Sequence, residues 1–208
     1  MFTGIVTDIG VVAFRDGSRL GIRTGYEAAS IVAGASIACN GCCLTVVRQA
    51  EGEGGGAVFE VDVSNETASK TTLGNWQKGT RINLERSLAL GDELGGHLVT
   101  GHIDGVARIV ERVKNGDSVR FGLEVQRELA GYIAAKGAVA LNGVSLTVNE
   151  VDGDRFGVNL IPYTLMNTTW NDLGPGDMVN LEVDILARYV ERLASVRFTA
   201  LRRNEDAA

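Results

Sequence analysis

The chain has 208 residues, of which 45% are hydrophobic and 22% charged, an ordinary composition for one or two globular domains that argues against disorder and fibres. Its formal net charge of −6 gives a surface that repels nucleic acid and anionic membranes. No stretch approaches the roughly 18 apolar residues of a membrane helix, and the start MFTGIVTDIG lacks the regions of a signal peptide. We therefore expect a cytoplasmic protein with neither nucleic acid nor membrane as partner.

Several stretches alternate apolar and polar residues with the period of two that is typical of half-buried antiparallel strands. They cover residues 59–63, 119–125, 156–160 and 179–183. Turn signals occur at residues 15–17, 51–56 and 151–154. The chain also holds 27 glycines against 2 prolines, spread along its length, as many tight turns require. These patterns predict a mostly β protein, either a sandwich or a small barrel.

The sequence repeats itself. Residues 40–46, NGCCLTV, match residues 142–148, NGVSLTV. Further matches fall in the same order at a nearly constant offset: Thr3-Gly4 with Thr100-Gly101, Thr67 with Thr164, Thr71-Thr72 with Thr168-Thr169, and Asn83-Leu84-Glu85 with Asn180-Leu181-Glu182. The repeat predicts two similar β domains, one in residues 1–96 with a connector at 87–96, and one in residues 97–184.

The segment 185–208 has no counterpart in the first copy. Leu186, Tyr189, Val190 and Leu193 recur at the spacing i, i+3, i+4 and i+7, which predicts an amphipathic helix. Two uses of its apolar face remain open at this point: docking on its own domain, or contact with another subunit.

The two copies differ at a few reactive positions. Cys43 in the first copy corresponds to Ser145 in the second, and Ile5 corresponds to His102. Two related sites with different reactive groups can hold two similar ligands in non-equivalent ways. Cys43 is a candidate nucleophile or acid–base thiol, and His102 a candidate general acid or base. Each also has an ordinary interpretation, as a buried thiol in a strand and as a hydrogen-bonding loop histidine.

The spacing of Cys39 and Cys42 resembles half of a zinc motif, but the chain has no second cysteine pair. We interpret both as small buried hydrophobic residues. His97 and His102 are not at the spacing of a helical metal motif, and no glycine-rich stretch fits a nucleotide fingerprint. We therefore expect neither a metal nor a cofactor.

Three features together resemble riboflavin synthase of the trimeric, lumazine-binding type. They are the start MFTGIV, the paired NGCCLTV and NGVSLTV segments, and GGHLVTGH at residues 95–102. The resemblance covers essentially the whole chain. It implies an all-β fold of two tandem, six-stranded, antiparallel Greek-key barrels followed by a helix at 185–208, through which three chains associate. It also implies an active site between the first barrel of one subunit and the second barrel of its neighbour.

The resemblance implies a transferase reaction, the last step of riboflavin biosynthesis. Two molecules of 6,7-dimethyl-8-ribityllumazine dismutate, and the transfer of a four-carbon unit gives riboflavin and 5-amino-6-ribitylamino-uracil, without cofactor or metal. The partners implied are the lumazine, two further copies of the chain, and lumazine synthase. The alternatives are a non-catalytic lumazine- or flavin-binding antenna protein, and a structural β protein that binds no lumazine. The combination of Cys43, His102 and Ser145 favours the enzyme, since a protein that only binds does not need all three.

The resemblance also carries substrate-binding positions to this chain. In the first copy they are Gly4, Ile5, Val6, Cys43, Leu44, Thr45, Asp62, Val63, Ser64, Asn65, Glu66 and Thr67. In the second copy they are Gly101, His102, Ile103, Lys136, Ser145, Leu146, Thr147, Leu160, Ile161, Pro162, Tyr163, Thr164 and Leu165. We expect backbone groups to pair with the pyrimidinedione edge, and the threonine hydroxyls and Glu66 with the ribityl chain. An ordinary surface carboxylate is the alternative for Asp62 and for Glu66.

Catalysis in this family needs one lumazine to lose a proton from its acidic 7-methyl group and the other to accept a nucleophile at C7. Our hypothesis is that His102 and the hydroxyls of Ser145 and Thr147 assist proton transfer and addition. Cys43 would polarise or add to the partner lumazine, with water as the alternative nucleophile.

Overall fold

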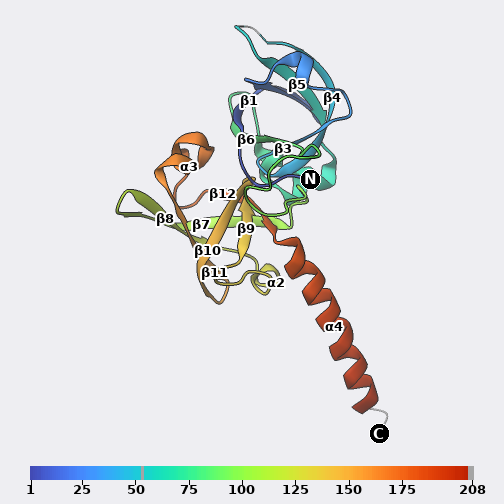
Figure 1. Cartoon of the computed structure of the whole chain (residues 1–208), viewed down its shortest axis with the longest axis vertical. Coiled ribbons are helices and arrows are strands. Elements are labelled where there is room, and N and C mark those ends of the chain that lie inside the picture. The colour runs from blue at the N-terminus through green and yellow to red at the C-terminus, as the bar shows by residue number, and fades with distance from the viewer. Residues whose placement is uncertain (53, 206–208) are drawn as a thin grey trace.

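A computed structural model describes residues 1–52 and 54–205, and the side chains of residues 1–52 and 54–196. Its main chain forms two closed six-stranded antiparallel barrels and a long C-terminal helix (Figure 1). This arrangement confirms the predicted fold of two tandem barrels followed by a helix.

The first barrel uses the first half of the chain. Its strands are β1 (Asp8–Asp16), β2 (Arg19–Thr24), β3 (Ser36–Cys39), β4 (Cys42–Glu51), β5 (Ala57–Asp62) and β6 (Arg81–Arg86). Its helical turns are η1 (Ala28–Ser30), α1 (Asn65–Lys70) and η2 (Thr72–Asn75). The strands follow the order β1-β2-β5-β4-β3-β6, and pairing of β1 with β6 closes the ring.

The second barrel repeats this topology. Its strands are β7 (Gly105–Asn115), β8 (Ser118–Glu124), β9 (Ala138–Leu141), β10 (Val144–Asp152), β11 (Arg155–Leu160) and β12 (Met178–Val183). Its helices are α2 (Arg127–Ala130), α3 (Pro162–Asn167) and η3 (Thr169–Asp172). Read from β7, the closed ring runs β7-β8-β11-β10-β9-β12, the same order as in the first barrel. The internal repeat therefore extends from the motifs to the strand connections.

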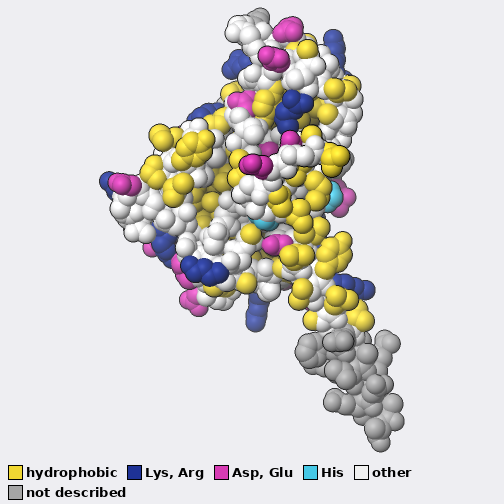
Figure 2. All heavy atoms as spheres, viewed as in Figure 1, with side chains coloured by type: hydrophobic (Ala, Val, Ile, Leu, Met, Phe, Trp, Pro, Cys, Tyr) yellow, Lys and Arg dark blue, Asp and Glu magenta, His cyan; other side chains and the backbone are white. Residues whose placement is uncertain are grey.

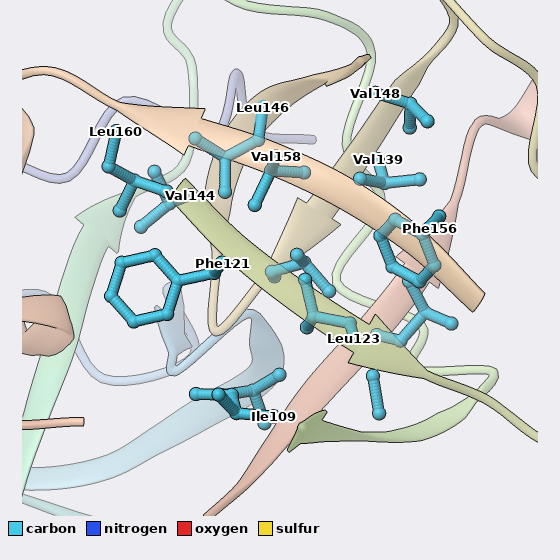
Figure 3. Close-up of a cluster of buried hydrophobic side chains, with 14 of the residues drawn as sticks. Ile109, Phe121, Leu123, Val139, Val144, Leu146, Val148, Phe156, Val158 and Leu160 are labelled. Atoms are coloured by element: carbon cyan, nitrogen blue, oxygen red, sulfur yellow. The ribbon is translucent and has the colours of Figure 1, made fainter. Parts of the chain in front are cut away.

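The alternating residues fill the barrels. In the second barrel, Phe121 and Leu123 of β8 point inward with residues of the other strands (Figure 3), and both are fully buried. Phe121 meets Trp170 edge to face, with ring centroids 4.9 Å apart. Burial of each such side chain contributes roughly 1.5–3 kcal/mol to folding. The period of two therefore predicted correctly which side chains form this core.

The two barrels meet at four buried asparagines that are related by an approximate two-fold axis. The side-chain amide of Asn83 donates to the carbonyl of Asn142, and that of Asn180 donates to the carbonyl of Asn40, each at 2.9 Å. Within each barrel, Asn40 accepts the backbone N–H of Asn83 at 2.7 Å, and Asn142 accepts that of Asn180 at 2.8 Å. The repeated Asn-Gly turns therefore join the barrels as well as turning the chain.

The helix α4 (Ile185–Glu205) extends away from both barrels (Figure 1). Its predicted apolar side chains are exposed, Leu193 by 69%, and they form a hydrophobic strip along its described part (Figure 2). Its first turn is held by Asp104, which forms an ion pair with Arg188 at 2.9 Å. The apolar face therefore does not dock on its own barrels. Within the described residues, no helix is both long enough and apolar enough to cross a membrane.

Candidate functional site

Two segments cross between the barrels, and we call residues 2–5 the first crossing segment and residues 99–102 the second. Phe2 and Val99 pair as an antiparallel bridge, with N–H to carbonyl distances of 2.7 and 3.1 Å. Both side chains are buried together with Ala38 of β3 and Ala140 of β9. The bridge places the beginning of each copy at the junction.

Each crossing segment then contacts the opposite barrel. The backbone N–H of Ser145 donates to the carbonyl of Gly4 at 2.8 Å, and that of Cys43 donates to the carbonyl of Gly101 at 2.9 Å. Beyond the crossing segments, Val6 packs on the core of the second barrel and Ile103 on the core of the first.

This exchange brings residues of different copies together in each site. Gly4, Ile5 and Val6 belong beside Ser145 rather than beside Cys43, because the crossing segments change places at the junction. Gly101, His102 and Ile103 belong for the same reason to the side of the first barrel that carries Cys43. We refer below to the Cys43 site and the Ser145 site.

Residues in the Cys43 site come from neighbouring strands. Cys43 is partly exposed on β4 and Thr45 is exposed two residues on, whereas Leu44 points into the core. Because Val46 pairs with Val61 of β5, the end of β5 and the loop after it lie beside this part of β4. The side chains exposed at the end of β5 and after it are Asp62, Ser64, Asn65 and Glu66, while Val63 is buried and Thr67 is partly buried.

Two of these residues already have partners. The carboxylate of Asp62 accepts from the guanidinium of Arg19 at 3.0 and 3.2 Å, and this hydrogen bond lowers the pKa of Asp62. The hydroxyl of Ser64 caps α1 by accepting from the N–H of Thr67 at 3.1 Å. Asp62 therefore fits the interpretation as a surface carboxylate in an ion pair.

The other two cysteines lie inside the first barrel. Cys39 and Cys42 are buried, and burial raises the pKa of the Cys42 thiol to about 12 and that of Cys39 well above its ordinary value. Their predicted role as buried hydrophobic residues is confirmed. Cys43 is the partly exposed thiol of the three.

The Ser145 site contains His97, for which the sequence pattern suggested no role beyond a disfavoured metal ligand. His97 places Nδ1 2.7 Å from the hydroxyl oxygen of Ser145. Burial lowers the pKa of His97, and within the described residues its Nε2 is buried without a hydrogen-bond partner. A neutral imidazole beside a hydroxyl can accept the hydroxyl proton. The contact was not predicted, because His97 has no counterpart in the first copy.

An open groove of about 530 Å³ adjoins the Ser145 site. Its lining combines residues 5–9 of the first copy with Tyr163, Met166 and Asn167 of α3. The groove therefore joins the predicted positions Ile5, Val6 and Tyr163, which come from different copies.

The remaining predicted residues of the second copy have mixed surroundings. Thr147 and Ile161 are exposed, Lys136 is exposed with a φ of +67°, and Pro162 begins α3. Leu146, Leu160 and Leu165 belong to the core, and the carbonyl of Thr164 accepts the hydroxyl of Thr168 at 2.7 Å.

Within one chain, His102 and the hydroxyl of Ser145 lie in different sites. His102 is exposed and follows Gly101, which contacts Cys43, whereas the hydroxyl of Ser145 bonds to His97. Within one chain, the two reactive groups that face each other are therefore His97 and Ser145.

Two buried glutamates hold the crossing segments. Glu85 of β6 accepts from the N–H of Thr3 at 2.6 Å, from the hydroxyl of Thr3 at 2.8 Å and from the N–H of Gly4 at 2.9 Å. Glu182 of β12 accepts from the equivalent groups of Thr100 and Gly101, at 2.7, 2.6 and 2.8 Å. Burial raises the pKa of both carboxyls, and these hydrogen bonds oppose the rise. The sequence showed these glutamates only as part of the repeat.

Comparison with known proteins gives consistent matches along the chain. The family model of the lumazine binding domain matches residues 3–87 and again residues 100–184. A riboflavin synthase of Brucella abortus is 54% identical over 198 residues, covering 93% of this chain and 98% of that protein. Riboflavin synthases of Mycobacterium tuberculosis (strain H37Rv) and Photobacterium phosphoreum are 42% and 37% identical over 201 residues. These two matches cover 93% and 94% of this chain, and 98% and 90% of the relatives.

The fold also matches solved structures with bound ligands. The crystal structure of LumP complexed with riboflavin aligns with a TM-score of 0.75 at 26% sequence identity, covering 88% of this chain and 99% of that one. LumP complexed with 6,7-dimethyl-8-(1'-D-ribityl) lumazine aligns with a TM-score of 0.74 at the same identity and coverage.

Proposed function

The chain belongs to the riboflavin synthase family, and we propose that it converts two molecules of 6,7-dimethyl-8-ribityllumazine into riboflavin and 5-amino-6-ribitylamino-uracil. This is a transferase reaction, in which one lumazine donates a four-carbon unit to the other. The observation that carries the proposal is the pair of related sites with unlike reactive groups, Cys43 in one and Ser145 with His97 in the other.

We assign one lumazine to each site. In the Cys43 site, Thr45, residues 62–67 and residues 101–103 of the opposite copy surround the position. In the Ser145 site, Thr147, residues 4–6 and residues 160–165 do so, together with Lys136. In support of this assignment, one of the matching LumP structures was solved in complex with 6,7-dimethyl-8-(1'-D-ribityl) lumazine.

The unlike groups suit the unlike tasks of the two molecules. One lumazine loses a proton from its 7-methyl group, and the other accepts a nucleophile at C7. The hydroxyl of Ser145, with His97 as its proton acceptor, assists the proton transfer from the 7-methyl group. Cys43, or a water molecule held beside it, adds at C7 of the other lumazine. Holding the two molecules face to face supplies much of the remaining rate enhancement.

We further propose that the protein works as a homotrimer joined through α4. The apolar strip of Leu186, Tyr189, Val190 and Leu193 supports this assembly, because its own barrels leave it exposed. The active site would then combine the first barrel of one subunit with the second barrel of its neighbour. This arrangement brings Cys43 and His102 of one copy together with Ser145 and Thr147 of the next.

The same proposal covers the organisation and setting of the chain. In this proposal residues 1–96 and 97–184 form the two lumazine-binding domains, and residues 185–208 form the trimerisation helix and tail, of which 206–208 lie outside the described residues. The proposal also includes a cytoplasmic location and an association with lumazine synthase.

One experiment distinguishes the enzyme from the alternatives. The purified protein is incubated with the lumazine alone, and riboflavin is followed by its absorbance and fluorescence. We expect turnover without any added metal or cofactor, and a large loss of turnover in the variant Ser145→Ala. Tight lumazine binding without conversion would identify an antenna protein, and no binding would identify a structural protein.

A further inference from the structure

Glu85 and Glu182 each accept hydrogen bonds from one crossing segment, and we call each such set of bonds a clamp. Each clamp joins a glutamate of one barrel to a segment that contacts the other barrel. Glu85 lies in the first barrel and is 5% exposed, yet the segment that it holds contacts the second barrel. Glu182 lies in the second barrel and is 1% exposed, yet its segment contacts the first. Each carboxylate accepts three hydrogen bonds from one crossing segment.

A single glycine links each clamp to a reactive residue. The N–H of Gly4 donates to Glu85 at 2.9 Å, while its carbonyl accepts the N–H of Ser145 at 2.8 Å. The N–H of Gly101 likewise donates to Glu182 at 2.8 Å, while its carbonyl accepts the N–H of Cys43 at 2.9 Å. In each case the N–H that bonds to the glutamate and the carbonyl that bonds to the reactive residue belong to the same glycine. A shift of the clamp therefore moves the carbonyl to which Ser145 or Cys43 is bonded.

The contacts leave little room for independent movement. A Cβ on Gly4 would lie 2.6 Å from the Cβ of Ser145, and one on Gly101 would lie 2.5 Å from the Cβ of Cys43. Hydrogen bonds that N–H groups donate to a buried carboxylate are among the stronger ones in proteins. The crossing segments are therefore held firmly from one barrel and pressed against the other.

We propose that Glu85 and Glu182 are positioning residues that act crosswise. Glu85 of the first barrel sets the geometry of the Ser145 site, and Glu182 of the second barrel sets the geometry of the Cys43 site. This inference rests on the proposed function only for the ligand of these sites. The geometric claim itself concerns the two reactive residues and is open to test without lumazine.

The test uses a reporter thiol in each site of the full chain. Cys43 is the first reporter, and its alkylation by iodoacetamide is followed by mass spectrometry, because Cys39 and Cys42 are buried. The double variant Cys43→Ser, Ser145→Cys moves the reporter to the other site. Glu85→Gln and Glu182→Gln are each combined with both reporters, because glutamine keeps the shape but turns one acceptor into a donor that faces N–H groups.

We expect Glu182→Gln to change the alkylation rate of Cys43 by about fivefold or more, as loss of a buried charged hydrogen bond would allow. Glu85→Gln, although it shares a barrel with Cys43, should change that rate by less than about twofold. With the reporter at position 145 the two effects should exchange. If each glutamate instead affects the reporter in its own barrel, or both variants affect both reporters equally, the crosswise assignment is wrong.

A milder pair of variants covers the case in which a glutamine variant does not fold. Thr100→Val and Thr3→Val each remove one hydroxyl from a clamp and keep the carboxylate. We expect Thr100→Val to alter the Cys43 reporter and Thr3→Val the reporter at 145, and the reverse pattern would overturn the proposal. Lumazine turnover of the unsubstituted chain is measured in parallel. A crosswise pattern of alkylation in the variants, combined with no turnover by the unsubstituted chain, would refute the proposed function alone.

Discussion

Gly101 of the second copy lies directly against Cys43 of the first, with its carbonyl accepting the Cys43 N–H at 2.9 Å and with a φ of +79°. Two separate structural features therefore require glycine at position 101. Its backbone conformation favours glycine, and its missing side chain leaves room for Cys43.

The substitution Gly101→Ala should therefore damage the Cys43 site. We expect a destabilisation of about 2–4 kcal/mol, from the left-handed conformation together with the collision, and a loss of most lumazine turnover. Unfolding in urea and steady-state turnover measure the two effects.

Gly34→Ala is a matched control, because Gly34 also has a positive φ, +88°, but nothing lies within 4 Å of an added Cβ. It should cost about 1 kcal/mol and keep turnover. Equal losses in both variants would show that backbone strain, rather than contact with Cys43, decides the outcome.

The lowered pKa of His97 predicts a pH dependence of stability. Since burial favours the neutral imidazole in the folded state, the unfolded chain takes up this proton first as the pH falls below the ordinary value of 6.5. The folded protein should therefore lose stability between neutral pH and the lowered pKa, and His97→Asn should lose less over the same range. Asparagine keeps a polar atom near the position of Nδ1.

The measurement compares urea midpoints of the wild type and His97→Asn at pH 8 and pH 5, so that the other titrating groups cancel. His102→Gln serves as control, because His102 is exposed. An identical acid sensitivity in wild type and His97→Asn would contradict the role of burial at this residue.

The asparagines at the junction should be among the more sensitive polar residues in the described part of the chain. Asn83→Leu removes the bond to the carbonyl of Asn142 and the acceptor for the N–H of Thr169, and both groups are buried. We expect a destabilisation of about 2–5 kcal/mol, since each buried group left without a partner costs roughly 1–3 kcal/mol. The exposed Asn171→Ala should change stability by less than about 0.5 kcal/mol. Urea unfolding that gave similar values for both would show that water replaces the lost bonds.

Removal of α4 tests the proposed assembly. Truncation after Asp184 should shift sedimentation from trimer to monomer, because it removes the exposed apolar strip. The single variant Leu193→Glu should weaken the trimer in the same direction, whereas Arg192→Gln, a change at a polar position of the helix, should not. A trimer that survives truncation would assign the interface to the barrels.

The position of Phe2 predicts an unequal effect of terminal extensions. Phe2 is fully buried and paired with Val99, and the carbonyl of Met1 accepts the N–H of Leu88 at 2.9 Å. An N-terminal tag should therefore reduce lumazine turnover more than a C-terminal tag of the same length. Equal turnover of the two tagged proteins would show that the first crossing segment tolerates displacement.

Sequence patterns predicted correctly those features that depend on residues close together in the chain or on equivalent positions of the repeat. Alternation identified Phe121 and Leu123 as core residues, because the side chains of a strand point to opposite faces in turn. The repeat identified Cys43 and Ser145 as equivalent positions. Equivalence, however, says which residues correspond and not which ones touch.

The contacts that decide the site join residues far apart in the chain. Gly4 bonds to Ser145, and His97 lies 48 residues before its partner Ser145. His97 also lies outside the repeated motifs, so comparison of the copies could not mark it. Glu85 and Glu182 resembled strand residues of ordinary exposure, and only the path of the crossing segments shows why a charge is buried at each.

The bonds from Asn83 to Asn142 and from Asn180 to Asn40 are contacts that two identical chains of half the length could make with each other. The covalent link between the halves therefore adds effective concentration rather than new contacts at this junction. It also removes a restriction, since two identical chains must carry the same residue at both sites. A thiol at position 43 in one site and a hydroxyl at position 145 in the other require that the two halves can mutate separately, and joining them in one chain permits this.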